Sequence, residues 1–161
     1  VPATPEGPRH FVFHPTADLL YSVNEDNSTV TGHRFDPQRG TLQALETLST
    51  LPAGGYPGNT AAEIAISPDG RFLYASNRGH DTLAVFKVES DGALSLRGHV
   101  PTEPTPRFFA LDPTGGYVLA VGQASGRLAS YRRDRDTGML APLAVHQVGQ
   151  NPLWITFVRK L

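Results

Sequence analysis

One pattern occurs three times along the chain and begins a fourth time near its end. Each copy contains a run of strand-forming residues, a turn that includes proline, and a second strand-forming run. The turns centre on Pro15, Pro68 and Pro113, which lie 53 and 45 residues apart. Repeats of about 40–50 residues that hold four short strands each are typical of β-propeller blades. The sequence therefore predicts an all-β fold, a β-propeller of four-stranded antiparallel blades.

The repeat also predicts where each blade and strand lies. We expect three blades, at about residues 7–51, 60–104 and 105–150. The second strand of a blade is expected at Leu19–Val23, Phe72–Ser76 and Tyr117–Val121. The third is expected at Thr29–Phe35, Thr82–Val88 and Arg127–Arg132, and the fourth begins at a Gly-x-Leu motif, at Gly40, Gly92 and Gly138.

Large apolar residues and one charged run have simple expected places. We expect Trp154 and the phenylalanines of the first strands, which include Phe11, Phe13 and Phe109, to belong to the core. The run 132–136 alternates arginine with aspartate, so it is expected to form a solvated turn between the third and fourth strands.

The fourth copy is incomplete. Residues 151–161 align with the first strand of a blade, and no further strand of that blade follows. Closed propellers remove free sheet edges because one end of the chain completes a blade that the other end began. We therefore expect a partial propeller, three blades and one closing strand, from the interior of a longer chain. Its open edges are expected to be covered by missing N-terminal blades of the parent chain or by self-association.

Composition excludes several kinds of partner and site. Fourteen basic and fifteen acidic residues leave the chain almost neutral, and without a basic stripe we expect no nucleic acid partner. The absence of cysteine excludes disulfides and cysteine-ligated zinc, and it fits the cytoplasmic location that we expect. No apolar stretch approaches the ~18 residues of a membrane span, so no membrane partner is expected. The six histidines show no metal-ligand spacing, so we expect no metal site.

Polar residues lie where the first strands begin and the second strands end. The first strands begin at Arg9-His10, Ala62-Glu63 and Arg107-Phe108, and the second strands end at Asn24-Glu25, Asn77-Arg78 and Gly122-Gln123. Because the second strand runs antiparallel to the first, these positions share one face of the disc. First strands line the central channel of a propeller, so these side chains are expected to surround its mouth.

Such a group of side chains can catalyse proton transfer, but other interpretations stay open. A His or Glu can deprotonate water, and Arg side chains can hold an anionic group or a developing oxyanion. Polar mouths also occur in propellers without catalysis, and a lone histidine such as His10 is often structural. Asn24 and Asn77 can instead form side-chain hydrogen bonds to the backbone of the tight turns that follow them. Segment 51–59 is expected to be a loop, either a surface insertion or a partial cover over a site.

Several motifs resemble those of the lactonase family of seven-bladed propellers, whose best-known members are bacterial 6-phosphogluconolactonases. The similar motifs are Gly7-Pro8-Arg9-His10, Val23-Asn24-Glu25, Ala62-Glu63-Ile64, Asn77-Arg78, Thr105-Pro106-Arg107 and Gly122-Gln123. The ending Val148-Gly149-Gln150-x-Pro152-x-Trp154 is also similar. The resemblance covers essentially the whole chain and corresponds to the C-terminal part of such a protein.

The resemblance implies that the protein hydrolyses 6-phosphoglucono-1,5-lactone to 6-phosphogluconate in the pentose phosphate pathway, without a metal or organic cofactor. It implies catalytic parts for His10, Glu63 and Arg107, which fall at matching motif positions, with either His10 or Glu63 activating water. An anionic sugar lactone is then the expected partner. The expected substrate-binding residues are Arg9, Asn24, Glu25, Asn77, Arg78 and Gln123.

Two other functions stay open. Some relatives within the family close a lactone from an unsaturated diacid such as carboxymuconate, so a muconate-type lactonizing enzyme is one alternative. A propeller that binds a sugar acid or a protein without catalysis is the other, because a fold alone does not confer an activity.

Overall fold

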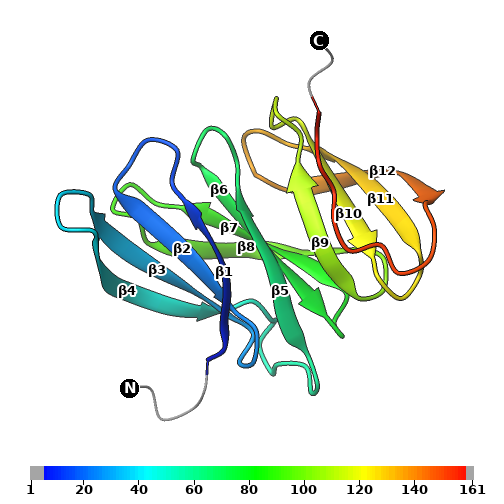
Figure 1. Ribbon diagram of the computed structural model, residues 1–161, viewed down its shortest axis with the longest axis horizontal. Helices are drawn as coiled ribbons and strands as arrows, with labels where there is room; N and C mark the ends of the chain where they lie inside the picture. The colour runs from blue at the N-terminus through cyan, green and yellow to red at the C-terminus, as the bar shows by residue number, and fades with distance from the viewer. Residues whose placement is uncertain (1–5, 159–161) are drawn as a thin grey trace.

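The chain forms three sheets that stand side by side (Figure 1). The structure is a computed structural model that describes residues 6–158, and every regular element within that range is a β-strand. Each sheet contains four antiparallel strands in the order in which they follow along the chain. None of the described residues belongs to a helix long and apolar enough to cross a membrane. The predicted fold class, a partial β-propeller of four-stranded antiparallel blades, is confirmed.

The strands have the following bounds. The first sheet contains β1 (Pro8–Phe13), β2 (Leu19–Asn24), β3 (Thr29–Asp36) and β4 (Thr41–Ser49). The second contains β5 (Thr60–Ile66), β6 (Phe72–Arg78), β7 (Thr82–Val88) and β8 (Leu94–Pro101). The third contains β9 (Pro106–Leu111), β10 (Tyr117–Gly122), β11 (Arg127–Arg133) and β12 (Leu140–Gln147).

Turn chemistry explains why each first strand reverses at its proline. In the second sheet the Gly70 N–H donates to the Ser67 carbonyl at 2.8 Å, and Gly70 has a φ of 70°. The left-handed region is open to glycine without steric cost. In the third sheet the Asp112 carboxylate accepts from the Tyr117 N–H at 2.7 Å, so the same hairpin is closed by a side chain.

The first strands of the sheets lie next to one another, with β1 beside β5 and β5 beside β9 (Figure 1). One hydrophobic core lies between the first and second sheets and includes Tyr21 and Phe86. A second core lies between the second and third sheets and includes Tyr74 and Phe109. Both faces of the second sheet are therefore covered, which agrees with the continuous apolar run Phe72-Leu73-Tyr74 in β6.

A tyrosine hydrogen bond links each sheet to the next. The Tyr21 hydroxyl donates to the Gly92 carbonyl at 2.9 Å, and the Tyr74 hydroxyl donates to the Gly138 carbonyl at 2.8 Å. Burial raises the pKa of Tyr21 to about 12, with Asp91 and Glu46 adding to the effect. Both phenols are therefore neutral donors at physiological pH.

Three expectations about burial are wrong. Phe11 is 62% exposed and Phe13 48% exposed, because no sheet within the described residues covers the outer face of β1. Trp154 is 66% exposed, whereas Phe109 is buried as expected. Arg133, predicted to lie in a solvated turn, is only 5% exposed and donates to Asp69 Oδ2 at 2.9 Å. It thereby joins the third sheet to the proline turn of the second.

The incomplete fourth copy also differs from its prediction. Residues 151–158 form no strand, and residues 159–161 of the predicted closing strand lie outside the described residues. A first strand pairs with the second strand of its own blade, and the sequence holds no fourth copy of that second strand. Residues 151–158 therefore have no blade of their own to pair with.

Candidate active site at the channel mouth

His10 and Glu63 meet where β1 and β5 begin. His10 Nδ1 and Glu63 Oε2 lie 3.0 Å apart. The register of β5 on β6 shifts between Ala61 and Ile64, so Glu63 lies in a bulge, and bulges redirect the side chains that they contain. Within this bulge the Glu63 N–H donates to Ser76 Oγ at 3.0 Å. The bulge explains how the carboxylate of Glu63, in the second sheet, reaches His10 in the first sheet.

Burial sets the acid–base character of Glu63. The residue is 7% exposed, and burial raises the pKa of its carboxyl, an effect that the Ile64 N–H and His10 offset only in part. Glu63 Oε1 accepts from the Ile64 N–H at 3.0 Å, so both carboxylate oxygens are engaged. When Glu63 is ionised, His10 Nδ1 must be the donor of their hydrogen bond. His10 Nε2 is then the ring nitrogen left to accept a proton from another molecule.

Arg9, Glu25 and Arg78 form a second charged group at this mouth. Glu25 Oε2 accepts from Arg9 Nη1 at 2.8 Å, and Glu25 Oε1 accepts from Arg78 Nη2. Arg78 also donates to the Ala61 carbonyl at 3.1 Å. Burial raises the pKa of Glu25, but the hydrogen bonds and charges of Arg78 and Arg9 outweigh it and hold that pKa below its usual value. Two guanidinium groups and one carboxylate leave a net positive charge, which suits an anionic ligand.

Two hollows open at the mouth. The first, of about 340 Å³, is lined by Arg9, His10, Arg107, Phe108, Leu153 and Trp154. The second, of about 380 Å³, extends from Glu63 along mostly apolar residues of β1, β5 and β9 to Pro68 and Pro113 at the opposite ends of the first strands. Phe108 and Trp154 line both, and their rings lie against each other with centroids 3.9 Å apart. The His10–Glu63 contact therefore lies between a cationic hollow and an apolar one.

Asn24 and Asn77, predicted to bind substrate, are built into the sheets. Asn24 is 2% exposed, and its Nδ2 donates to the hydroxyls of Thr29 and Thr31 at 2.8 and 2.9 Å. Asn77 is fully buried; its Oδ1 accepts from Thr50 Oγ1 at 2.7 Å, and its Nδ2 donates to the Thr50 carbonyl at 2.7 Å. These hydrogen bonds and the burial of both side chains hold them within the blades, so neither asparagine joins the mouth group.

Gln123 also stays apart from that group. Its backbone N–H donates to the Thr105 carbonyl at 2.9 Å, and its side chain lines neither hollow. Six of the nine predicted residues are thus brought together, and three are not. The six are Arg9, His10, Glu25, Glu63, Arg78 and Arg107.

One feature of the mouth was not anticipated. Trp154, which was expected in a core, lines both hollows together with Phe108, a residue expected at the mouth. The only signal for Trp154 was an aromatic residue in the incomplete repeat.

Segment 51–59 lines neither hollow. Its Tyr56 ring packs edge-on against His80 with centroids 5.4 Å apart. This placement favours the interpretation of the segment as a surface insertion rather than a cover.

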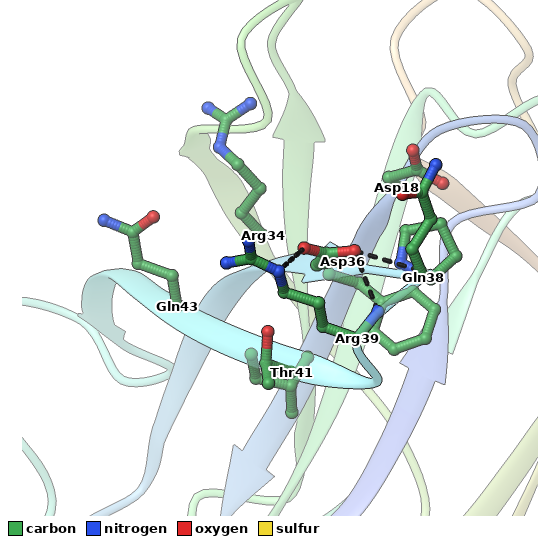
Figure 2. Close-up of a pocket in the computed structure, with 10 residues that line it drawn as sticks. Asp18, Arg34, Asp36, Gln38, Arg39, Thr41 and Gln43 are labelled. Carbon is green, nitrogen blue, oxygen red and sulfur yellow. Dashed lines mark hydrogen bonds and ion pairs between the residues drawn. The ribbon is translucent and has the colours of Figure 1, made fainter.

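A larger hollow, of about 530 Å³, lies at the β3–β4 turn (Figure 2) and has a structural explanation. Asp36 Oδ1 accepts from the backbone N–H groups of Gln38 and Arg39 at 2.9 and 3.1 Å, which closes the turn. The hollow contains none of the predicted site residues. Neither here nor elsewhere within residues 6–158 do three His, Cys, Asp or Glu side chains gather as a metal site requires.

Comparison with known proteins gives consistent matches. The family model described as lactonase, 7-bladed beta-propeller, matches residues 2–157. A 6-phosphogluconolactonase of Pectobacterium carotovorum is 45% identical over 151 residues, which are 93% of this chain and 46% of that protein. The chain therefore spans about half the length of the curated relatives that it matches.

Solved structures show the same likeness. A putative 6-phosphogluconolactonase from Bacteroides fragilis superposes with a TM-score of 0.88 at 32% identity, over 96% of this chain and 43% of that one. A periplasmic gluconolactonase from Pseudomonas aeruginosa superposes with a TM-score of 0.84 at 32% identity, over 93% and 42% of the two chains.

Proposed function

The chain belongs to the lactonase family of seven-bladed β-propellers, and we propose that the protein that contains it hydrolyses a sugar lactone. The substrate that we propose is 6-phosphoglucono-1,5-lactone, and the product is 6-phosphogluconate, an intermediate of the pentose phosphate pathway. The observation that carries this proposal is the contact of His10 with the buried Glu63 beside three arginines. The names of the relatives support it further.

His10 is the better candidate for the general base. Glu63 has both oxygens engaged, by His10 and by the Ile64 N–H, whereas His10 Nε2 is left for proton transfer. In this mechanism Nε2 accepts a proton from water while the water oxygen bonds to the lactone carbonyl carbon. The ionised Glu63 orients the ring and stabilises the imidazolium that forms, as a carboxylate does in a catalytic triad.

The arginines have separate parts in this mechanism. Arg107 lines the hollow with His10, so it would stabilise the oxyanion of the tetrahedral intermediate. Collapse of that intermediate breaks the bond to the ring oxygen, which takes the proton back from His10, and the new acid ionises in water. Arg9 and Arg78 would hold the phosphate, because their shared carboxylate neutralises only one of their two charges.

Single alanine substitutions test the assignment. In the full-length protein we expect His10→Ala and Glu63→Ala each to lower the rate of lactone loss at neutral pH by about 10²–10⁴-fold. The spontaneous opening of the lactone must be measured without enzyme and subtracted. Gln43→Glu, an exposed change on β4 away from the mouth, is the matched control. Turnover that is unchanged in both alanine variants would contradict the assignment.

A substrate panel separates this function from the two alternatives. Lactone closure from an unsaturated diacid can use the same base, so sugar lactones with and without phosphate should be compared with muconate-type acids. We expect the phosphorylated lactone to be preferred, and Arg9→Met to reduce that preference while the unphosphorylated lactone is affected less. Preferred turnover of a diacid would favour a lactonizing enzyme. Tight binding of a sugar acid without turnover of any compound would favour a binding module.

The cytoplasmic location expected from the sequence stays a prediction. A periplasmic gluconolactonase is among the structural relatives, so the periplasm is the alternative location. Cell fractionation of the source organism, followed by detection of the protein in each fraction, tests the location directly.

A further inference from the structure

One position of the repeat supplies four side chains to the mouth. It lies five residues before the turn proline of each sheet and holds His10, Glu63 and Phe108. The incomplete copy holds Trp154 at the same position. His10 and Glu63 can exchange protons, whereas Phe108 and Trp154 are aromatic. The mouth therefore has an aromatic side, which the proposed mechanism does not use.

The next position of the repeat faces the hydrophobic cores instead. Ile64 belongs to the core between the first and second sheets, and Phe109 belongs to the core between the second and third. The counterpart of these two residues in the incomplete copy is Ile155. Successive side chains of a strand point to opposite sides, so in the register of the repeat Ile155 takes the core side and Trp154 the mouth side. The exposure of Trp154 therefore follows from its place in the repeat.

Two contacts fix the indole ring of Trp154. One face of the indole lies against the ring of Phe108, with centroids 3.9 Å apart, and Figure 1 shows this segment in red beside β9. The Trp154 Nε1–H donates to Thr156 Oγ1 at 3.1 Å. The residue is nevertheless 66% exposed, so the other face of the indole is open. An aromatic ring that is held in one orientation and left open is a preformed surface for an apolar ligand face.

The hollow of about 340 Å³ brings this ring together with the proposed catalytic groups. His10, Arg107 and Trp154 all line it. Ligand sites are commonly hollows of this size or larger, in which aromatic and apolar side chains surround a few polar groups. A ligand that fills the hollow would contact the indole ring and His10 at the same time.

A six-membered sugar lactone has the surface that such a ring requires. In the gluco configuration the hydroxyl groups and the sixth carbon lie around the edge of the ring, so each face of the ring presents C–H groups. An indole face is stabilised by covering C–H groups of this kind. The polar edge of the sugar is then left free for the arginines. An open-chain sugar acid has no fixed apolar face to offer.

We propose that Trp154, supported by Phe108, stacks on a C–H face of the lactone ring and makes the site specific for cyclic sugars. This inference rests on the proposed lactone hydrolysis. The stacked ring lies in the hollow that His10 lines, so its carbonyl carbon is within reach of the water that His10 deprotonates. Trp154 thus binds the ring of the substrate, whereas Arg9 and Arg78 hold its phosphate.

Kinetics of the full-length protein test this division of parts. We expect Trp154→Ala to lower kcat/KM about 3–10-fold, mainly through a higher KM, because the stacked ring is bound before and during the reaction. The factor should be the same for glucono-1,5-lactone and its 6-phosphate, whereas Arg9→Met should affect the phosphorylated lactone more. Trp154→Phe keeps a ring and should recover most of the loss. Tyr117→Ala is the matched control, since Tyr117 is 45% exposed and lines neither hollow.

A binding experiment tests the stacking without turnover. The probe 1,5-anhydroglucitol 6-phosphate keeps the sugar ring but has no carbonyl to hydrolyse, and glucitol 6-phosphate is its open-chain counterpart. We expect the cyclic probe to shift the indole N–H resonance of Trp154, identified by its loss in Trp154→Phe, and to bind several-fold more tightly than the open-chain compound. The two probes also differ in flexibility, so the decisive comparison is between proteins. The preference for the ring should shrink in Trp154→Ala and persist in Tyr117→Ala.

The outcomes separate this inference from the proposed function. The stacking is refuted if the cyclic probe leaves the indole resonance of Trp154 in place or does not bind, or if the preference for the ring is as large in Trp154→Ala as in wild type. It is equally refuted if Trp154→Ala affects only the phosphorylated lactone. A shifted indole resonance with lactone loss that is unchanged in His10→Ala and Glu63→Ala would instead contradict the hydrolysis and leave the ring-binding surface. If Trp154→Ala fails to fold, the resonance of the wild-type protein decides.

Discussion

At the scale of single residues, two glutamates of the mouth have opposite environments. Glu63 is buried, and burial raises the pKa of its carboxyl although His10 is close. Glu25 lies between Arg9 and Arg78, which outweigh burial and lower its pKa. One carboxylate is therefore destabilised by the fold and the other is stabilised by it, so their effects on stability depend on pH with opposite sign.

This contrast predicts the pH dependence of two variants. Because the folded pKa of Glu63 exceeds the unfolded value of about 4.3, wild type loses stability relative to Glu63→Gln as pH rises from that value through the folded pKa. Because the folded pKa of Glu25 is depressed, wild type is stabilised relative to Glu25→Gln above about pH 4.3, and this stabilisation is lost as pH falls through the folded pKa. Urea unfolding between acid and neutral pH measures both differences. A difference of the same sign for the two variants would contradict these assignments.

At the scale of elements, the tyrosine bonds hold neighbouring sheets together. We expect Tyr21→Phe and Tyr74→Phe each to lower the free energy of unfolding by about 1–2 kcal/mol, since each leaves a buried glycine carbonyl without its partner. Urea unfolding of the purified chain measures the loss. Tyr56→Phe, at a residue 47% exposed, is the matched control and should change little. If the control lowers the free energy of unfolding as much as the two test variants do, the loss in those variants cannot be assigned to the hydrogen bonds between sheets.

The strands themselves could be predicted from the sequence because local signals agree with the fold. The predicted second strand Leu19–Val23 corresponds to β2 at Leu19–Asn24. This strand was predictable because it follows a proline turn and occupies the same position in every copy of the repeat. Burial was harder to predict, because it depends on neighbouring sheets. Phe11 has the pattern of a core residue, yet no sheet within the described residues covers it.

The site was predicted in part, and the failures have a common physical reason. His10 and Glu63 both lie where first strands begin, so the repeat predicts that they share one face. The sequence does not reveal the bulge in β5 that brings His10 Nδ1 within 3.0 Å of Glu63 Oε2. Asn77 follows the same pattern as Arg78, yet it is fully buried and bonded to Thr50. Adjacent residues of a strand point to opposite sides, and which side faces the mouth is decided by sheet packing.

At the scale of the whole molecule, the mouth is a product of assembly. His10 comes from β1 of the first sheet, Glu63 from β5 of the second and Arg107 from β9 of the third, so no single blade contains the candidate site. Figure 1 shows these three strands next to one another. The two cores between sheets hold these strand ends together. Residues that act as one unit across such an interface are expected to show strongly non-additive effects on the reaction.

A double-mutant cycle on the full-length protein tests the central claim most directly. The values of kcat/KM for 6-phosphoglucono-1,5-lactone are compared among wild type, His10→Ala, Glu63→Ala and the double variant. In the proposed mechanism Glu63 acts only through His10, so we predict that the double variant is no slower than His10→Ala. Losses that multiply in the double variant, or single variants as fast as wild type, would contradict a His10–Glu63 unit that catalyses lactone hydrolysis.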